Sequence, residues 1–155
     1  MSIDVETGDA RWRSDLPDVD RVVERAGEAA LAGRSGGGVA VLLTSDEAVR
    51  ELNRRFRGKG SPTNVLSFPA APNVDEHLGD LALAFGVCAR EAREQNKSLA
   101  DHVSHLIVHG ALHLLGYDHE DDAEAEKMES LERDILAGLG VADPYAGDDR
   151  VAFGR

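Results

Sequence analysis

The sequence predicts an α+β domain in which a small mixed sheet of about four strands packs with about five helices. Three observations lead to this class. The chain has 155 residues, the size of one domain, and we expect a single domain over residues 1–155. Hydrophobic residues make up 42% and charged residues 30%, the balance of an ordinary globular protein. Strand-like and helix-like segments follow one another in the order β-α-β-α-β-β-α-α-α, which favours helices packed on a mixed sheet.

Two strands and a helix are expected before residue 44. Residues 1–6 alternate weakly between apolar and polar and predict a first strand. From Leu16 the apolar residues recur at helical spacing, and Gly33 is a suitable end for that helix. Glycines at 36–38 then break the chain before residues 39–43, a short apolar run typical of a buried strand.

The middle of the chain predicts a helix, a loop and two strands. Thr44 and Glu47 form a capping-box pattern for a helix that extends to about Phe56. Residues 57–63 contain two glycines and a proline and are therefore expected to form a loop. The two strands are residues 64–68, which end before a proline, and residues 78–85.

The last third predicts three helices and a tail. The helices are expected over residues 86–97, 98–115 and 120–139. Ser98 with Asp101 caps the second of them, and Gly116 suits the left-handed position that follows its end. Residues 141–155, which hold several acids and one proline, are expected to form a loose tail.

The overall charge is strongly acidic. The net charge is −12 and the pI is about 4.8, so the chain as a whole repels nucleic acid. Arg54, Arg55, Arg57 and Lys59 lie within six residues and form one candidate basic patch. Taken alone, this run is also explained by a solvated helix end, where cations interact favourably with the helix dipole.

No segment indicates a membrane span or an export signal. The longest apolar run, residues 81–89, is far shorter than the ~20 residues of a membrane span. The first residues are acidic and polar rather than basic and then apolar. Cys88 is the one cysteine in the sequence, which excludes an intrachain disulfide and a cysteine-rich zinc site. We therefore expect a cytoplasmic protein without membrane association.

Five of the six histidines lie between positions 102 and 119. His109 and His113 are four residues apart on the predicted helix, so they share one face, about 6 Å apart along the axis. Two imidazole nitrogens at that spacing can bind one tetrahedral metal ion. Gly116 then allows the chain to reverse, and His119 follows three residues later as a third ligand. The pattern H-x-x-x-H-x-x-G-x-x-H thus predicts one metal ion bound by His109, His113 and His119.

Three protein ligands leave the fourth position of a zinc ion open, which is typical of catalytic sites. A zinc ion there would lower the pKa of a bound water toward ~7. The alternative is a set of solvated or hydrogen-bonded histidines without a metal. His102 and His105 lie about two turns and one turn before His109 on roughly the same stripe, and packed, substrate-contacting and ligand-supporting roles stay open for both. Asp80, Asp118 and Glu129 are candidate acceptors for the second ring N–H of a ligand histidine.

Position 110 separates this pattern from that of the metzincin proteases, H-E-x-x-H-x-x-G-x-x-H, in which the glutamate is the general base. Gly110 occupies that position here and cannot take a proton, so a metalloprotease is disfavoured. Phosphodiester hydrolysis instead needs a metal together with a cation that neutralises charge on the phosphate. The basic loop at residues 57–59 can provide that cation, and an arginine can bind two phosphate oxygens at once.

The segment HGALHLLGYDH at residues 109–119 closely resembles the signature of the YbeY family of bacterial endoribonucleases. Three further segments are similar to the same family. They are RGK at 57–59 leading to PTNVLSFP at 62–69, LGDL at 78–81, and ME at 128–129. The resemblance as a whole covers roughly residues 40–140.

The resemblance implies a zinc-dependent endoribonuclease that cuts single-stranded RNA. It implies a part in ribosomal RNA maturation, notably at the 3′ end of 16S RNA, and in ribosome quality control, with ribosomal particles as partners. It also implies one Zn²⁺ ion on His109, His113 and His119, with His109 at the catalytic centre, and Arg57 with Lys59 on the RNA. An alternative of another class is a non-catalytic ribosome-assembly factor whose zinc only stabilises the fold. The net charge of −12 and the absence of an evident general base motivate it.

Overall fold

The computed structural model describes residues 2–32, 37–58, 60, 63–118 and 120–146. Within this part of the chain one sheet has the strand order β1-β2-β4-β3, and β1, β2 and β4 run parallel while β3 pairs antiparallel with β4 at one edge. The strands are β1 Ser2–Thr7, β2 Gly38–Thr44, β3 Val65–Pro69 and β4 His77–Ala84. The predicted mixed sheet is therefore confirmed.

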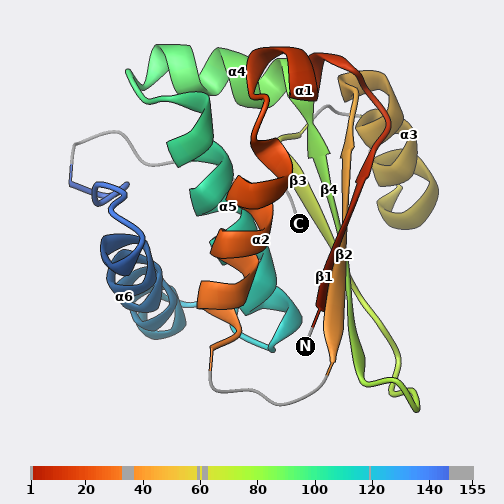
Figure 1. The fold of residues 1–155 in the computed structure, drawn as a ribbon. Coiled ribbons are helices and arrows are strands. Elements are labelled where there is room, and N and C mark those ends of the chain that lie inside the picture. Colours follow the sequence, from red (N-terminus) through yellow and green to blue (C-terminus); the bar gives the residue numbers. More distant parts are fainter. Residues whose placement is uncertain (1, 33–36, 59, 61–62, 119, 147–155) are drawn as a thin grey trace.

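Six helices accompany the sheet in the described residues, one more than the approximate number predicted. They are α1 Arg11–Asp15, α2 Val19–Ala30, α3 Asp46–Arg57, α4 Phe85–Glu94, α5 Leu99–Leu114 and α6 Asp122–Gly138. Helices α2, α5 and α6 lie on one side of the sheet and α3 lies on the other, while α1 and α4 lie across its upper end (Figure 1). The predicted α+β class is confirmed.

Helix α1 is the element that the sequence did not predict. Its five residues are too few to show a helical period, and its central feature is the complete burial of Trp12. The indole Nε1 of Trp12 donates a hydrogen bond to the backbone oxygen of Thr44 at 2.9 Å, and the ring meets Phe85 edge-on with centres 5.2 Å apart. A long-range contact therefore defines this segment, and the helix predicted from Leu16 begins later, at Val19.

The start of α3 also differs from the prediction. Its N-cap is Ser45, whose hydroxyl accepts a hydrogen bond from a backbone N–H of the first turn at 3.1 Å, and not Thr44. Thr44 stays in β2 because it is still paired with β4. By contrast, the predicted cap of α5 is correct, since the Ser98 hydroxyl accepts a hydrogen bond from the backbone N–H of Asp101 at 3.1 Å.

Helix α5 is the central helix of the core. Twelve of its 16 residues are buried, because the sheet packs on one side and α2, α4 and α6 pack on the others. Gly110 permits a close approach to the sheet: a Cβ at this position would lie 2.7 Å from Cδ2 of Leu81 on β4. Polar side chains of α5 are therefore held inside the protein, where they need hydrogen-bond partners.

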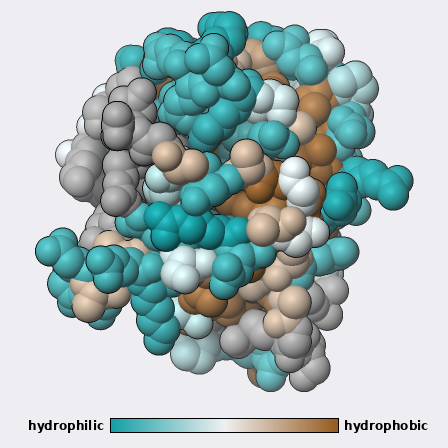
Figure 2. Space-filling view, turned by 90° about the vertical axis from the view of Figure 1, so that its left-hand side faces the viewer, coloured by the Kyte–Doolittle hydropathy of each residue, from teal (hydrophilic) through white to brown (hydrophobic). Residues whose placement is uncertain are grey.

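The side of the molecule along which α6 runs is predominantly hydrophilic, with a smaller apolar area near the middle of the view (Figure 2). None of the described helices combines the length and the hydrophobicity that a bilayer crossing requires.

Candidate metal centre

The second half of α5 places His105, His109 and His113 one turn apart on the same side of the helix. The imidazole rings of His109 and His113 have centres 4.9 Å apart and planes at 84° to each other. The Nε2 atoms of both rings are buried. The structure thus brings two of the three predicted metal ligands together.

The third predicted ligand, His119, lies outside the described residues. Before it, α5 ends at Leu114, and Gly116 takes a φ of +102°, the left-handed conformation expected of a glycine that follows a helix. In the described ranges no three His, Cys, Asp or Glu side chains form a group that could hold a metal ion. The donors that are described, two adjacent imidazoles, fit a zinc site that takes a further ligand from elsewhere in the chain.

Glu132 of α6 contacts the Nδ1 side of the His109 ring. Its Oε1 lies 2.5 Å from Nδ1 of His109, and its side chain is completely buried. Burial by itself raises the pKa of Glu132, but the hydrogen bonds from His105 and His109 outweigh it and lower the pKa to about 2. The ionised carboxylate can only accept, so Nδ1 of His109 carries the proton and Nε2 presents its lone pair to a metal.

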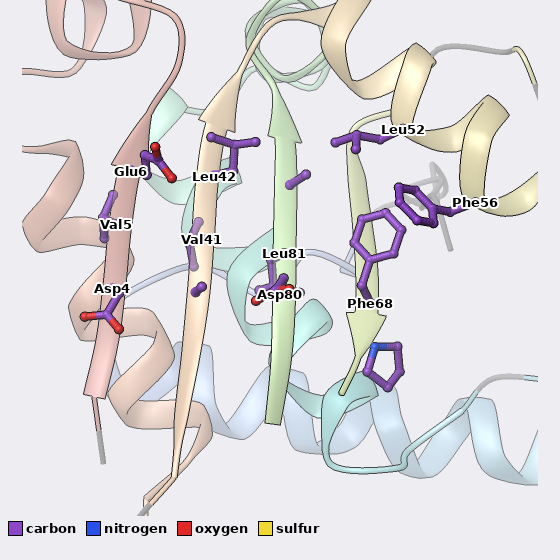
Figure 3. A pocket seen from close by; sticks show the side chains of 13 residues that line it. Asp4, Val5, Glu6, Val41, Leu42, Leu52, Phe56, Phe68, Asp80 and Leu81 are labelled. Carbon is purple, nitrogen blue, oxygen red and sulfur yellow. The ribbon is translucent and has the colours of Figure 1, made fainter. Parts of the chain in front are cut away.

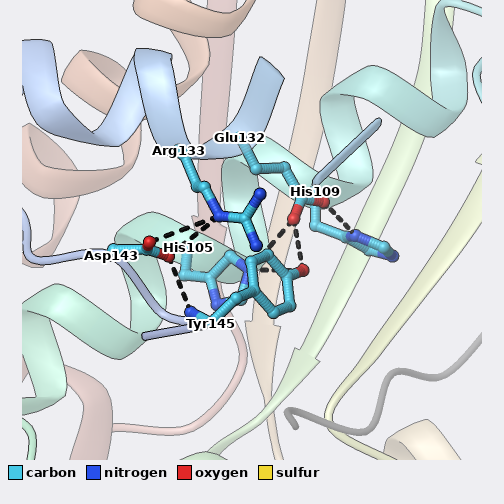
Figure 4. Close-up of polar contacts among 6 residues, drawn as sticks. All are labelled: His105, His109, Glu132, Arg133, Asp143 and Tyr145. Atoms are coloured by element: carbon cyan, nitrogen blue, oxygen red, sulfur yellow. Dashed lines mark hydrogen bonds and ion pairs between the residues drawn. The ribbon is translucent and has the colours of Figure 1, made fainter. Parts of the chain in front are cut away.

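The second oxygen of Glu132 has two further neighbours. The hydroxyl of Tyr145 donates a hydrogen bond to Oε2, and Nε2 of His105 lies 3.3 Å from Oε2 and 3.2 Å from the Tyr145 hydroxyl oxygen (Figure 4). Burial lowers the pKa of His105 more than the neighbouring carboxylate raises it. His105 therefore belongs to the network that supports His109.

Tyr145 lies in the segment that was expected to be a loose tail. Of residues 141–155, the structure describes 141–146, in which Pro144 is buried. The backbone N–H of Tyr145 donates a hydrogen bond to Oδ1 of Asp143 at 2.8 Å, and the guanidinium of Arg133 lies 5.3 Å from the centre of the Tyr145 ring. This part of the tail thus packs against α6.

Sequence reasoning missed both Glu132 and Tyr145. The acceptor for His109 is not one of the three acids considered, and one of those, Asp80, instead pairs with His77 at 2.9 Å. A signal for Glu132 was present, because the buried residues of α6 recur every four positions at Met128, Glu132 and Leu136. An acid on an apolar stripe needs a buried partner. Nothing comparable in the sequence marks Tyr145.

His102 belongs to a separate cluster near the start of α5. Its Nε2 lies 2.9 Å from Oε1 of Glu91 on α4, and the side-chain amide of Asn64 donates to the same oxygen at 3.1 Å. His102 is seven residues before His109, or about 10 Å along the helix axis. It is therefore a packed and hydrogen-bonded residue outside the candidate centre.

The basic patch lies at the end of α3. The helix ends at Arg57, and Gly58 follows with a φ of +69°. Arg54 forms an ion pair with Glu51 at 2.6 Å, so one of the four cations is already neutralised on the helix surface. Lys59 lies outside the described residues. The structure leaves the predicted roles of Arg57 and Lys59 in RNA binding untested.

A groove of about 730 Å³ lies on the opposite face of the sheet from α5. Residues of all four strands form its floor, with Leu52 and Phe56 of α3 along one side (Figure 3). Acidic side chains of Asp4, Glu6 and Asp80 line it, and none of its lining residues in the described part of the chain is a histidine. The candidate metal centre and this groove are therefore different sites.

The packing of Gly110 bears on the protease alternative. Because a Cβ at this position would meet Leu81 of the sheet, a side chain here would point at β4 rather than along the face of His109 and His113. The position cannot hold the glutamate base of a metzincin without rearranging the core.

Comparisons with known proteins show the family of this chain. Residues 8–140 match the family model described as "Endoribonuclease YbeY". The chain is 53% identical over 151 residues to the Endoribonuclease YbeY of Maricaulis maris (strain MCS10), an alignment covering 96% of this chain and 94% of that protein. It is 54% identical over 138 residues to the protein of the same name from Rhodopseudomonas palustris (strain ATCC BAA-98 / CGA009), covering 85% and 73% respectively.

A solved structure has a similar fold. The solution structure of TM1509 from Thermotoga maritima superposes with a TM-score of 0.55 at 26% sequence identity, covering 94% of this chain and 99% of that one. The family match spans both the histidine pair and Glu132. The chain therefore belongs to the Endoribonuclease YbeY family.

Proposed function

We propose that this chain is a zinc-dependent endoribonuclease that cleaves single-stranded RNA, with one zinc ion on His109, His113 and His119. The family is one of endoribonucleases, which are hydrolases of phosphodiester bonds, and membership implies a metal. The observation that carries the proposal is the pair of adjacent imidazoles on α5, with the buried carboxylate of Glu132 behind His109. Histidine with a supporting carboxylate is a common arrangement at catalytic zinc sites.

Glu132, Arg57 and Lys59 have separate roles in the proposed reaction. Glu132 holds the proton of His109 on Nδ1 and so keeps Nε2 available as a ligand. A zinc ion bound there supplies Lewis-acid stabilisation of the charge that develops on a phosphoryl oxygen. Arg57, together with Lys59 two residues later in the chain, would hold the phosphate, because a guanidinium can contact two phosphate oxygens. This local cation matters in a chain whose net charge is −12.

The biological setting follows from the same family. We propose ribosomal RNA, in particular the 3′ end of 16S RNA, as the substrate, with roles in ribosomal RNA maturation and ribosome quality control. Ribosomal particles are the corresponding partners and the cytoplasm is the location. Residues 1–155 are taken to act as one endoribonuclease domain.

The proposal is tested by zinc analysis and RNA cleavage on the purified protein. We expect about one zinc ion per chain and cleavage of a single-stranded RNA that a chelator abolishes and zinc restores. His113→Ala should lose the zinc and reduce cleavage roughly 100-fold or more, since it removes a ligand rather than a supporting residue. His77→Ala is the matched control, because it removes a histidine outside α5 that pairs with Asp80.

Two results would contradict the proposal. Cleavage that survives both chelation and His113→Ala would show that the metal is not catalytic. Zinc binding without cleavage, together with unchanged association with ribosomal particles in Arg57→Ala, would favour the assembly factor with a structural zinc.

A further inference from the structure

The segment that follows α6 returns to the candidate metal centre. The hydroxyl of Tyr145 donates a hydrogen bond to Oε2 of Glu132, whose other oxygen, Oε1, lies 2.5 Å from Nδ1 of His109 (Figure 4). One buried carboxylate thus joins the C-terminal segment to a candidate ligand that is 36 residues earlier in the chain.

Several contacts hold the Tyr145 ring in place. It meets the ring of His105 edge-on, with centres 5.4 Å apart and planes at 90°, and the Arg133 guanidinium lies over its face. Asp143 accepts hydrogen bonds from the backbone N–H of Tyr145 at 2.8 Å and from Nε of Arg133 at 3.3 Å. Together these contacts hold the Tyr145 hydroxyl in one position beside Glu132.

That position controls the orientation of the carboxylate. The hydroxyl fixes Oε2, and this leaves Oε1 facing His109. Without the hydroxyl, Oε2 would keep the contact with Nε2 of His105 at 3.3 Å, which is long for a hydrogen bond to a charged group. A carboxylate held less firmly at one oxygen supports the imidazole at its other oxygen less well.

We propose that Tyr145 is a positioning residue of the metal centre, which acts through Glu132 on the orientation of His109. The proposal rests on the proposed function only in taking His109 as a metal ligand. It assigns to residues 141–146 a role in metal binding.

The test measures zinc affinity by competition with a chromophoric chelator, and the absorption spectrum of the Co²⁺-loaded protein. The full chain is compared with Tyr145→Phe, Glu132→Gln and the double variant. Glu132→Gln should weaken zinc binding about 10- to 100-fold, and Tyr145→Phe, one bond further away, about 3- to 10-fold. Both should shift the Co²⁺ bands, because they move a ligand rather than remove one.

The double variant decides whether Tyr145 acts through Glu132. If it does, Tyr145→Phe should weaken zinc binding no more than about twofold once Glu132 is already glutamine. Ser104→Ala is the matched control: it also removes one hydroxyl of a hydrogen-bonded residue beside His105, but that hydroxyl bonds Ala100 of the same helix. Its zinc affinity and Co²⁺ spectrum should equal those of the wild type.

The outcomes separate this inference from the proposed function. Wild-type affinity and spectrum in Tyr145→Phe would overturn the inference, as would an equal loss in both backgrounds. A wild type that binds no zinc overturns both proposals, whereas one that binds zinc without cutting RNA overturns the function alone. Tyr145→Phe keeps the packing of the aromatic ring. Asp143→Asn weakens the contacts that hold Tyr145 but keeps its hydroxyl, so it should reduce zinc affinity by a smaller factor than Tyr145→Phe.

Discussion

Two of the buried histidines of helix α5, one near its start and one in its second half, can be compared by the glutamate of another helix that each contacts most closely. Near its start His102 contacts Glu91 of α4 at 2.9 Å, and toward its end His109 contacts Glu132 of α6 at 2.5 Å. Both histidines are buried, and each carboxylate has a further hydrogen-bond donor, Asn64 in the first case and Tyr145 in the second. By partner type the two pairs are nearly the same, although the Glu91 side chain is 17% exposed and that of Glu132 is completely buried.

The pairs differ in what surrounds the imidazole. His109 has a second imidazole, that of His113, with its ring centre 4.9 Å away, and a glycine with positive φ shortly after the helix end. His102 instead links α5 to α4 and to the start of β3. A histidine–carboxylate pair is therefore a common way to satisfy a buried polar group, and the adjacent imidazole is the feature that distinguishes the pair proposed to bind a metal.

The largest expected effect that separates the pairs comes from Glu132→Ala. It leaves the donors of His105, His109 and Tyr145 without their buried acceptor, so the free energy of unfolding of the metal-free protein should fall by about 3–5 kcal/mol. Zinc affinity should fall at least about tenfold as well. Urea unfolding and chelator competition measure the two effects. If Glu132→Ala keeps wild-type zinc affinity, the pair of His109 and Glu132 has a structural role alone, like the pair of His102 and Glu91.

Acidification should reduce the contribution of Glu132 to the free energy of unfolding by about 3 kcal/mol. The pKa of Glu132 is lowered from 4.5 to about 2, so its contribution is complete above pH 4.5 and is lost as the pH falls toward 2. The lowered pKa of His105 acts in the same direction, because the unfolded chain takes up the proton first. Urea midpoints of the metal-free protein between pH 7 and pH 2 test this. In Glu132→Gln the decline below pH 4.5 should be shallower, and an unchanged slope would contradict the assignment.

The smallest of the three effects is expected for His102→Ala. It removes a fully buried ring and leaves Glu91 with one donor fewer, which should reduce the free energy of unfolding by about 2–3 kcal/mol. Zinc affinity should stay within about twofold of the wild type, because His102 lies about 10 Å from His109 along the axis. A zinc affinity reduced tenfold would mean that both pairs serve the metal centre.

Local signals in the sequence predicted the helix that carries the site. The cap at Ser98, the end before Gly116 and the four-residue spacing of His109 and His113 involve neighbours in the chain, and the structure agrees with all three. The cap at Thr44 was wrong by one residue, because the pairing of β2 with β4 extends to that residue. Strand pairing with a distant part of the chain therefore determined that Ser45, and not Thr44, caps α3.

The sequence by itself determined the class of fold, the helix that holds the histidines and the family, because periodicity, caps and the spacing of a motif are properties of neighbouring residues. Only the tertiary structure decided that Glu132 and Tyr145 meet His109, that His102 has a different partner, and that Trp12 organises α1. The physical reason is that a buried polar group is satisfied by whichever donor or acceptor the packing brings within about 3 Å, at any distance along the chain.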